Sequence, residues 1–127
     1  MIIEIDVASE IPIYSQLVTQ IKIGMMKGKL NPGDNLPSVR NLAGDIGINL
    51  HTVNKAYKML VSEGLVTQEK KGYKITQENP PVISQDYLTN MKKQLENLII
   101  DGEVFNIDLQ KMLSEMTGEI RGVEQDD

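Results

Sequence analysis

The decisive stretch is residues 38–64, SVRNLAGDIGINLHTVNKAYKMLVSEG. It predicts two short helices joined by a tight turn. Ser38 is a good N-cap for the first helix, because its hydroxyl can accept a hydrogen bond from a backbone N–H that has no partner within the helix. Gly47 can take the left-handed conformation that ends this helix. Asn49 is a second N-cap, and the helix that follows it is expected to end at Gly64.

The second of these helices has two chemically different faces. One face is expected to be buried, because apolar side chains recur along it at helical spacing: Val53, Ala56, Tyr57, Leu60 and Val61. The opposite face and its flanks carry donors and cations, with no acid before Glu63: His51, Thr52, Asn54, Lys55, Lys58 and Ser62. A DNA major groove requires donors for base edges and cations for phosphates. The stretch is therefore interpreted as a helix-turn-helix with its recognition helix.

Residues 65–76, LVTQEKKGYKIT, predict a hairpin directly after that helix. Two short runs, 65–68 and 73–76, flank a turn that holds Lys70, Lys71 and Gly72. A basic hairpin in this place is a wing, which can lay its lysines along a phosphate backbone or into the minor groove.

The segment before residue 38 is expected to support the two helices. Residues 2–6, IIEID, alternate loosely and predict a short edge strand. Pro12 suits the first turn of a helix that runs to about residue 27. Its apolar stripe consists of Tyr14, Leu17, Val18, Ile21 and Met25.

The residues beyond Asn79-Pro80-Pro81 predict two more amphipathic helices. Asp101-Gly102 is expected to end the first of them, and Asn106 is expected to cap the second. Their apolar stripes are Leu88, Met91, Leu95 and Leu98, then Leu109, Met112, Leu113 and Met116. Two helices of this size have too little core to be stable alone. Their stripes therefore need a partner, either the first domain or a second copy of the chain.

Composition narrows the class of protein. The 127 residues suit one domain, or one small domain with an appendage, and the net charge is −5. Residues 22–74 nevertheless hold nine basic side chains against four acidic ones, so a basic segment adjoins an acidic tail. The chain contains no cysteine, no apolar run of ~18 residues and no secretory signal, so we expect a cytoplasmic protein without a membrane partner.

No catalytic set is visible in the sequence. The carboxylates are scattered, and the single histidine, His51, has no acid near it in the sequence. A metal role for His51 is disfavoured for the same reason and because cysteine is absent. The chain is therefore predicted not to be an enzyme and to need no cofactor.

The motifs together resemble GntR-type bacterial transcription regulators, and within them the short YtrA-like subfamily. The resemblance covers roughly residues 1–75 in the correct order. Its phrases are Pro12-Ile13-Tyr14-x-Gln16, Gly28-x-Leu30-x-Pro32-Gly33-Asp34-x-Leu36-Pro37-Ser38-x-Arg40-x-Leu42-Ala43, Gly47-Ile48-Asn49-Leu50-His51-Thr52-Val53-x-Lys55-Ala56-Tyr57, and Leu60-x-x-Glu63-Gly64-Leu65-Val66. The small two-helix tail, in place of a large ligand-binding domain, points to the subfamily.

The resemblance implies a mainly α protein with a small β-wing (α+β). A winged helix-turn-helix domain would span residues 1–78, and a two-helix dimerisation segment would span 79–127. It further implies a homodimeric repressor of operator DNA, often of a transporter operon, with a small-molecule effector left open. The residues expected to bind DNA are Ser38, Arg40, Asn49, Leu50, His51, Thr52, Asn54, Lys55, Lys58, Lys70 and Lys71.

Three alternatives stay open. Leu50 stands where many relatives carry Arg or Pro, and it either contacts a thymine methyl group or packs. Arg40 either contacts DNA or pairs with Asp45 or Asp34. The whole domain could also be a protein-interaction adaptor that does not bind DNA, a function that the acidic total favours and the basic segment disfavours.

Overall fold

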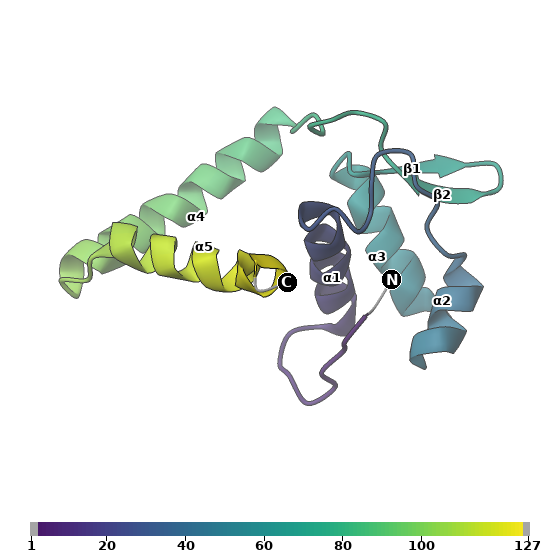
Figure 1. Ribbon diagram of the computed structural model, residues 1–127, viewed down its shortest axis with the longest axis horizontal. Helices are drawn as coiled ribbons and strands as arrows, with labels where there is room; N and C mark the ends of the chain where they lie inside the picture. The colour runs from purple at the N-terminus through teal and green to yellow at the C-terminus, as the bar shows by residue number, and fades with distance from the viewer. Residues whose placement is uncertain (1–2, 126–127) are drawn as a thin grey trace. The chain divides into compact units, whose positions relative to one another are not determined.

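The structure is a computed structural model that describes residues 3–125 (Figure 1). Its elements are α1 (Ile13–Met26), α2 (Val39–Ile46), α3 (Leu50–Ser62), β1 (Val66–Glu69), β2 (Gly72–Ile75), α4 (Gln85–Val104) and α5 (Leu109–Gln125). The predicted fold class, mainly α with a small β-wing, is confirmed. The chain divides into two compact units, Met1–Ile83 and Ser84–Asp127. Within the described part, no helix is long and apolar enough to cross a bilayer.

The core of the first unit is built on α3, against which both α1 and α2 pack. The apolar stripes predicted for α1 and α3 meet there, and their central members are almost fully buried: Leu17, Ile21, Val53, Tyr57 and Leu60. Burying a side chain of this size stabilises a fold by roughly 1.5–3 kcal/mol. This core fixes one face of α3, which leaves the opposite face free for another task.

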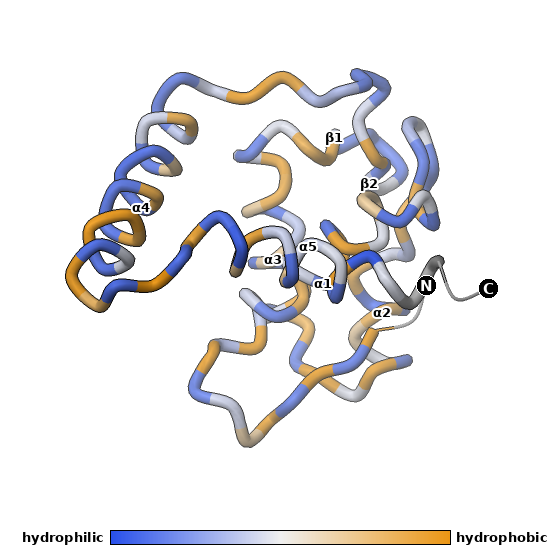
Figure 2. The backbone as a smooth tube through the Cα atoms, turned by 60° about the vertical axis from the view of Figure 1, so that its left-hand side comes forward, coloured by the Kyte–Doolittle hydropathy of each residue, from blue (hydrophilic) through white to orange (hydrophobic). Residues whose placement is uncertain are grey.

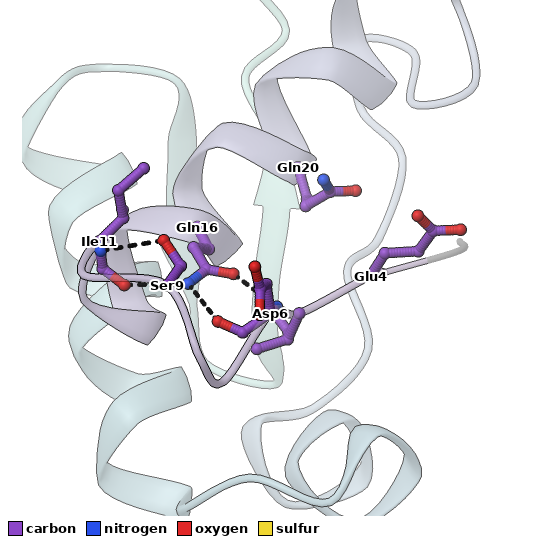
Figure 3. A pocket seen from close by; sticks show the side chains of 7 residues that line it. Glu4, Asp6, Ser9, Ile11, Gln16 and Gln20 are labelled. Carbon is purple, nitrogen blue, oxygen red and sulfur yellow. Dashed lines mark hydrogen bonds between the residues drawn. The ribbon is translucent and has the colours of Figure 1, made fainter.

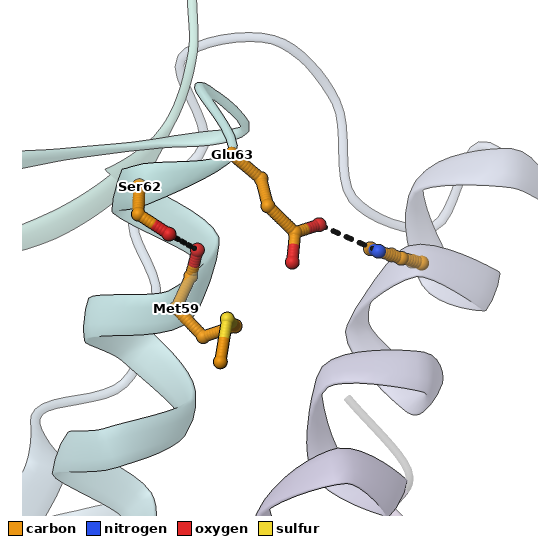
Figure 4. Close-up of polar contacts among 4 residues, drawn as sticks. Met59, Ser62 and Glu63 are labelled. Atoms are coloured by element: carbon orange, nitrogen blue, oxygen red, sulfur yellow. Dashed lines mark hydrogen bonds and ion pairs between the residues drawn. The ribbon is translucent and has the colours of Figure 1, made fainter. Parts of the chain in front are cut away.

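An ion pair joins the end of α3 to α1. The Lys22 Nζ atom lies 2.6 Å from the Glu63 Oε1 atom, and the Glu63 side chain is only 13% exposed (Figure 4). Directly after it, Gly64 has φ 79°, and the Leu65 N–H donates to the Leu60 carbonyl over 3.0 Å. The chain therefore leaves α3 in a fixed direction toward the hairpin.

The hairpin is a two-stranded antiparallel sheet that ends at the pair Glu69–Gly72, so Lys70 and Lys71 form its turn. The segment that leads into α2 lies along the other edge of β2. There the Gly33 N–H donates to the Ile75 carbonyl over 3.0 Å, and the Leu36 N–H donates to the Tyr73 carbonyl over 2.9 Å. The wing and the approach to α2 thus share one hydrogen-bonded ladder.

The N-terminal segment is not a strand. The strand expected at residues 2–6 is wrong for residues 3–6, and residue 2 lies outside the described residues. Instead, the Gln16 side chain accepts from the Asp6 N–H over 2.8 Å and donates to the carbonyls of Asp6 and Ile11, each over 2.9 Å (Figure 3). A side chain can satisfy backbone groups that would otherwise need a partner strand. Pro12 is the N-cap of α1, rather than a residue of its first turn.

The second unit differs from expectation at its turn. Asp101-Gly102 was expected to end the helix, but α4 continues through both residues to Val104. The turn follows at Asn106, which has φ 54°, and the Ile107 N–H donates to the Gly102 carbonyl over 2.8 Å. This is the Schellman pattern of a left-handed helix stop. Asn106 therefore ends α4 and does not cap α5.

The N-terminal cap of α5 is Asp108, whose Oδ1 atom accepts from the Lys111 N–H over 3.0 Å. Gly102 has a packing role in α4. It is buried, and a Cβ atom built on it would lie 3.6 Å from the Leu109 Cβ atom. The two helices therefore come together closely where they are joined.

Candidate nucleic-acid interface

The turn between α2 and α3 is fixed by local hydrogen bonds. The Ser38 Oγ atom accepts from the Asn41 N–H over 3.1 Å, and the Asn49 Oδ1 atom accepts from the His51 N–H over 2.7 Å. Gly47 has φ 70°, and the Ile48 N–H donates to the Ala43 carbonyl over 3.1 Å. Both predicted caps and the left-handed glycine are confirmed. The N-terminus of α3 is consequently set in a defined direction relative to α2.

Tyr57 fastens α3 to the segment before α2. Its side chain is fully buried, and its hydroxyl donates to the Pro37 carbonyl over 2.8 Å. Its ring also meets the Tyr73 ring of β2 edge to face, with centroids 5.0 Å apart. Burial raises the pKa of the Tyr57 hydroxyl, with a smaller contribution from Tyr73, so this group stays a donor. One side chain thus holds the approach to Ser38 and the wing in place around α3.

The face of α3 opposite the core is exposed, as predicted. His51, Asn54, Lys55 and Lys58 are exposed on it, and Thr52 is half-buried at its flank. Leu50 is half-buried at the start of α3 and packs against the core, with part of its side chain still exposed. The exposed side chains of this face are therefore donors and cations.

Lys55 lies against α1. Its Nζ atom is 4.0 Å from the centroid of the Tyr14 ring, a distance at which a cation and a ring attract each other. A shallow pocket of about 470 Å³ adjoins this pair, and its lining holds no carboxylate: Ile13, Tyr14, Asn49, His51, Thr52 and Lys55. Sequence reasoning placed Tyr14 in the apolar stripe of α1 and in a phrase of the family resemblance, and it gave Tyr14 no contact with α3. The spacing within one helix carries no signal for a contact with another.

Lys58 lies against the wing. Its Nζ atom donates to the Gln68 Oε1 atom of β1 over 2.8 Å and lies 5.8 Å from the centroid of the Tyr73 ring. Lys58 therefore links the recognition helix to the hairpin, a role that the sequence pattern did not indicate. The contact leaves its positive charge on the exposed side of α3.

Three of the four acids of the basic segment are engaged with other groups. Glu63 pairs with Lys22, and the Glu69 Oε1 atom lies 3.0 Å from the Lys74 Nζ atom. Asp34 accepts from the Asn31 N–H over 2.8 Å. Among residues 3–125, no ion pair joins Arg40 to Asp34 or Asp45.

Arg40 and the turn lysines, Lys70 and Lys71, are exposed. Together with His51, Asn54, Lys55 and Lys58 of α3, they supply exposed positive charges and donors from α2, α3 and the wing. In the described part of the chain, no cluster of three or more His, Asp or Glu side chains could hold a metal ion. The arrangement suits binding of a large anion rather than chemistry at one atom.

Comparison with known proteins gives a family match. Residues 13–72 match the model of bacterial regulatory proteins, gntR family. The chain is also 38% identical to the HTH-type transcriptional repressor YtrA of Bacillus subtilis (strain 168), over 98% of this chain and 99% of that protein.

Solved structures extend the likeness to three dimensions. A transcriptional antiterminator from Listeria monocytogenes EGD-e has a TM-score of 0.85 at 30% identity, covering 94% of this chain and 92% of that one. YtrA from Sulfolobus acidocaldarius, described as a GntR-family transcription factor, has a TM-score of 0.63 at 40% identity, covering 76% and 99%. The AraR DNA-binding domain in complex with operator ORX1 has a TM-score of 0.54 at 26% identity, covering 60% and 99%.

Proposed function

Because the chain belongs to the gntR family of bacterial regulatory proteins, we propose that it is a homodimeric repressor that binds operator DNA and controls a transporter-type operon. Family membership makes it a transcriptional regulator with a DNA-binding winged helix, and not an enzyme. The proposal adds the residues that touch DNA, the oligomeric state and the kind of target.

The observation that carries the DNA-binding surface is the exposed, acid-poor face of α3, and the proposal extends this surface over the exposed Arg40 and the wing turn. In this proposal, Asn49, His51 and Asn54 donate to base edges, and Thr52 lies at the flank of the same surface. The cations bind phosphates: Arg40, Lys55, Lys58, Lys70 and Lys71. Ser38 adds a hydroxyl beside Arg40. Leu50 is half-buried, and the exposed part of its side chain can contact a thymine methyl group, so it stays in the proposed DNA-binding set.

Exposed apolar stripes on α4 and α5 support the homodimer. Met91, Leu95 and Leu98 are 43–50% exposed on α4, and Met112, Leu113 and Met116 are 40–50% exposed on α5. Figure 2 shows apolar residues recurring among polar ones along α4. Monomeric proteins rarely leave large contiguous apolar patches in water. A second copy of the chain would cover these stripes, and the half-buried Leu88 and Leu109 would lie at their margins. The resulting dimer would present two recognition helices about one DNA turn apart.

The DNA-binding surface is tested by an electrophoretic shift assay with the region upstream of the protein's own gene at several salt concentrations. Arg40→Ala should weaken binding and reduce the slope of log K against log[salt] by about 1.8, the value for two lost phosphate contacts, one from each protomer of the dimer. Lys92→Ala is the matched control, because it removes an exposed basic side chain of α4. Binding of the wild type that does not depend on salt would contradict the proposed surface.

The dimer is tested by sedimentation of the full chain carrying Leu95→Glu. A charge in the stripe should yield a monomer with weaker operator binding. Gln94→Glu, which adds the same charge at an exposed polar neighbour, should remain a dimer. If Leu95→Glu also sediments as a dimer, the tail is not the interface.

The target is tested by sequencing the DNA that copurifies with the protein from cells. The proposal expects the bound sites to lie upstream of genes that encode membrane transporter subunits. Sites confined to other classes of gene would reject this part of the proposal and leave DNA binding intact.

Antitermination is a second candidate function, favoured by the likeness to the Listeria protein that carries that description. Transcription in vitro distinguishes the two. A repressor reduces initiation at the operator-bearing promoter, whereas an antiterminator leaves initiation unchanged and increases read-through of a downstream terminator.

A further inference from the structure

We propose that Tyr14 is a positioning residue of the DNA interface, whose ring holds the Lys55 ammonium group where it reaches a DNA phosphate. The inference rests on the proposed role of Lys55 in DNA binding. It extends that role by adding a residue of α1, which lies outside the helix-turn-helix and the wing.

The geometry of the pair supports this role. The Lys55 Nζ atom stands 4.0 Å from the Tyr14 ring centroid, although Lys55 itself is exposed. The Tyr14 ring is half-buried and packs against the core, so its position is fixed by α1 and not by Lys55. A free lysine side chain has about 2 kcal/mol of rotamer entropy to lose when it is immobilised. A ring that already confines the side chain reduces the part of that loss that falls on DNA binding.

The chemistry of the contact leaves Lys55 available to an anion. A ring attracts the ammonium group through its π face, which neutralises no charge and accepts no conventional hydrogen bond. Lys58 differs, since one of its N–H groups is already donated to Gln68. The pocket beside Lys55 is lined without a carboxylate, so no acid there competes with a phosphate. Among the described residues, Lys55 is therefore the recognition-helix lysine that is held in place with no donor committed to an acceptor.

A purely structural role for the contact predicts a different result. If Tyr14 and Lys55 only hold α1 against α3, removing the ring changes stability, and any effect on DNA binding is the same whether residue 55 is charged or not. If Tyr14 positions Lys55 for a phosphate, the effect on DNA binding requires the Lys55 charge. A double-mutant cycle measured on DNA affinity separates these cases.

The experiment uses the full chain with Tyr14→Leu and Tyr14→Phe, each alone and combined with Lys55→Met. Affinity for a duplex from the protein's own upstream region is measured by fluorescence anisotropy over a series of salt concentrations. Thermal unfolding of each variant shows that it is folded at the assay temperature. Tyr14→Met replaces Tyr14→Leu if the latter does not fold.

The proposal expects Tyr14→Phe to bind within about twofold of the wild type, because the ring face is kept. Tyr14→Leu should weaken binding about two- to fivefold for each protomer bound, the size of one exposed cation–π contact. Its salt slope should be unchanged, since the Lys55 charge remains. Lys55→Met should lower the slope by about 1.8, because each protomer of the dimer loses one phosphate contact. In the Lys55→Met background, Tyr14→Leu should have no further effect on affinity.

Two results would overturn the role of Tyr14: equal weakening by Tyr14→Leu in both backgrounds, or Tyr14→Phe as damaging as Tyr14→Leu. The first would show a structural role, and the second would assign the effect to the hydroxyl. Failure of the underlying function looks different. If Lys55→Met keeps the wild-type affinity and salt slope, the proposed DNA contact of Lys55 is wrong. If neither the wild type nor any variant binds this duplex more tightly than a random-sequence duplex, the proposed operator binding itself is wrong.

Discussion

Replacing Tyr57 with Phe tests how α3 holds the approach to α2. The change removes the hydroxyl that donates to the Pro37 carbonyl over 2.8 Å and keeps the ring, with its edge-to-face contact to Tyr73. No cavity larger than one oxygen atom is created. The measured change in stability therefore reports the contribution of this hydrogen bond.

The expected loss of stability follows from the hydrogen bond that the Pro37 carbonyl no longer accepts. A typical hydrogen bond contributes about 0.5–1.5 kcal/mol net, and a buried acceptor left without a partner costs about 1–3 kcal/mol. Pro37 is half-buried, so water can reach part of that carbonyl. We expect Tyr57→Phe to lower the free energy of unfolding by about 1–2 kcal/mol, which is about 5–15 °C in Tm for a domain of 60–100 residues.

Urea and thermal unfolding followed by circular dichroism measure the loss of stability. The shift assay reports whether the change also weakens DNA binding, as expected if it displaces Arg40 in the first turn of α2 from its proposed phosphate contact. Tyr73→Phe is the matched control. It keeps a ring of the same aromatic pair, and its hydroxyl donates no hydrogen bond in the described structure. A Tyr57→Phe protein as stable as the wild type, or a Tyr73→Phe protein equally destabilised, would refute the reasoning.

Three further predictions concern stability. Burial raises the pKa of Tyr57 above its ordinary value of about 10, so the unfolded chain loses the Tyr57 proton at a lower pH than the folded chain does. The free energy of unfolding should therefore fall as pH rises above about 10. Urea titrations at several pH values should show a smaller fall in Tyr57→Phe. Gly33 has φ 85°, and an added Cβ atom would lie 2.8 Å from the side-chain amide of a glutamine. Gly33→Ala should therefore lower the free energy of unfolding by about 1–2 kcal/mol. Gly44 lies in open space within α2, so Gly44→Ala should leave stability unchanged or increase it. Glu63→Gln breaks the charge pairing with Lys22 and should cost up to about 1 kcal/mol in low salt, with a smaller difference in high salt.

The features that sequence reasoning predicted correctly are those with short-range causes. The caps at Ser38 and Asn49 and the left-handed Gly47 depend on residues two or three positions away. The buried face of α3 follows from spacing alone. In each case the residue types leave few alternatives, because a helix end must find partners for its unpaired backbone groups.

The features that sequence reasoning missed depend on contacts between different elements of the fold. The sequence predicts that the helix ends at Gly102. A glycine inside a helix lowers its stability by only about 1 kcal/mol relative to alanine, and close packing against Leu109 can offset this loss. The strand expected at residues 2–6 had no partner strand specified by its own sequence. The contacts of Lys55 with Tyr14 and of Lys58 with Gln68 join different elements, so no local pattern encodes them.

The ladder shared by β2 and residues 33–36 also bears on how such a chain can change length in evolution. An insertion between Gly33 and Leu36 would shift the register of that segment along β2 and displace the start of α2 with it. The turn at Lys70 and Lys71 lies beyond the last paired residues of the hairpin, so extra residues there extend the loop and leave the ladder intact. Reach toward DNA can therefore vary at the tip of the wing, while the distance between wing and recognition helix stays constant.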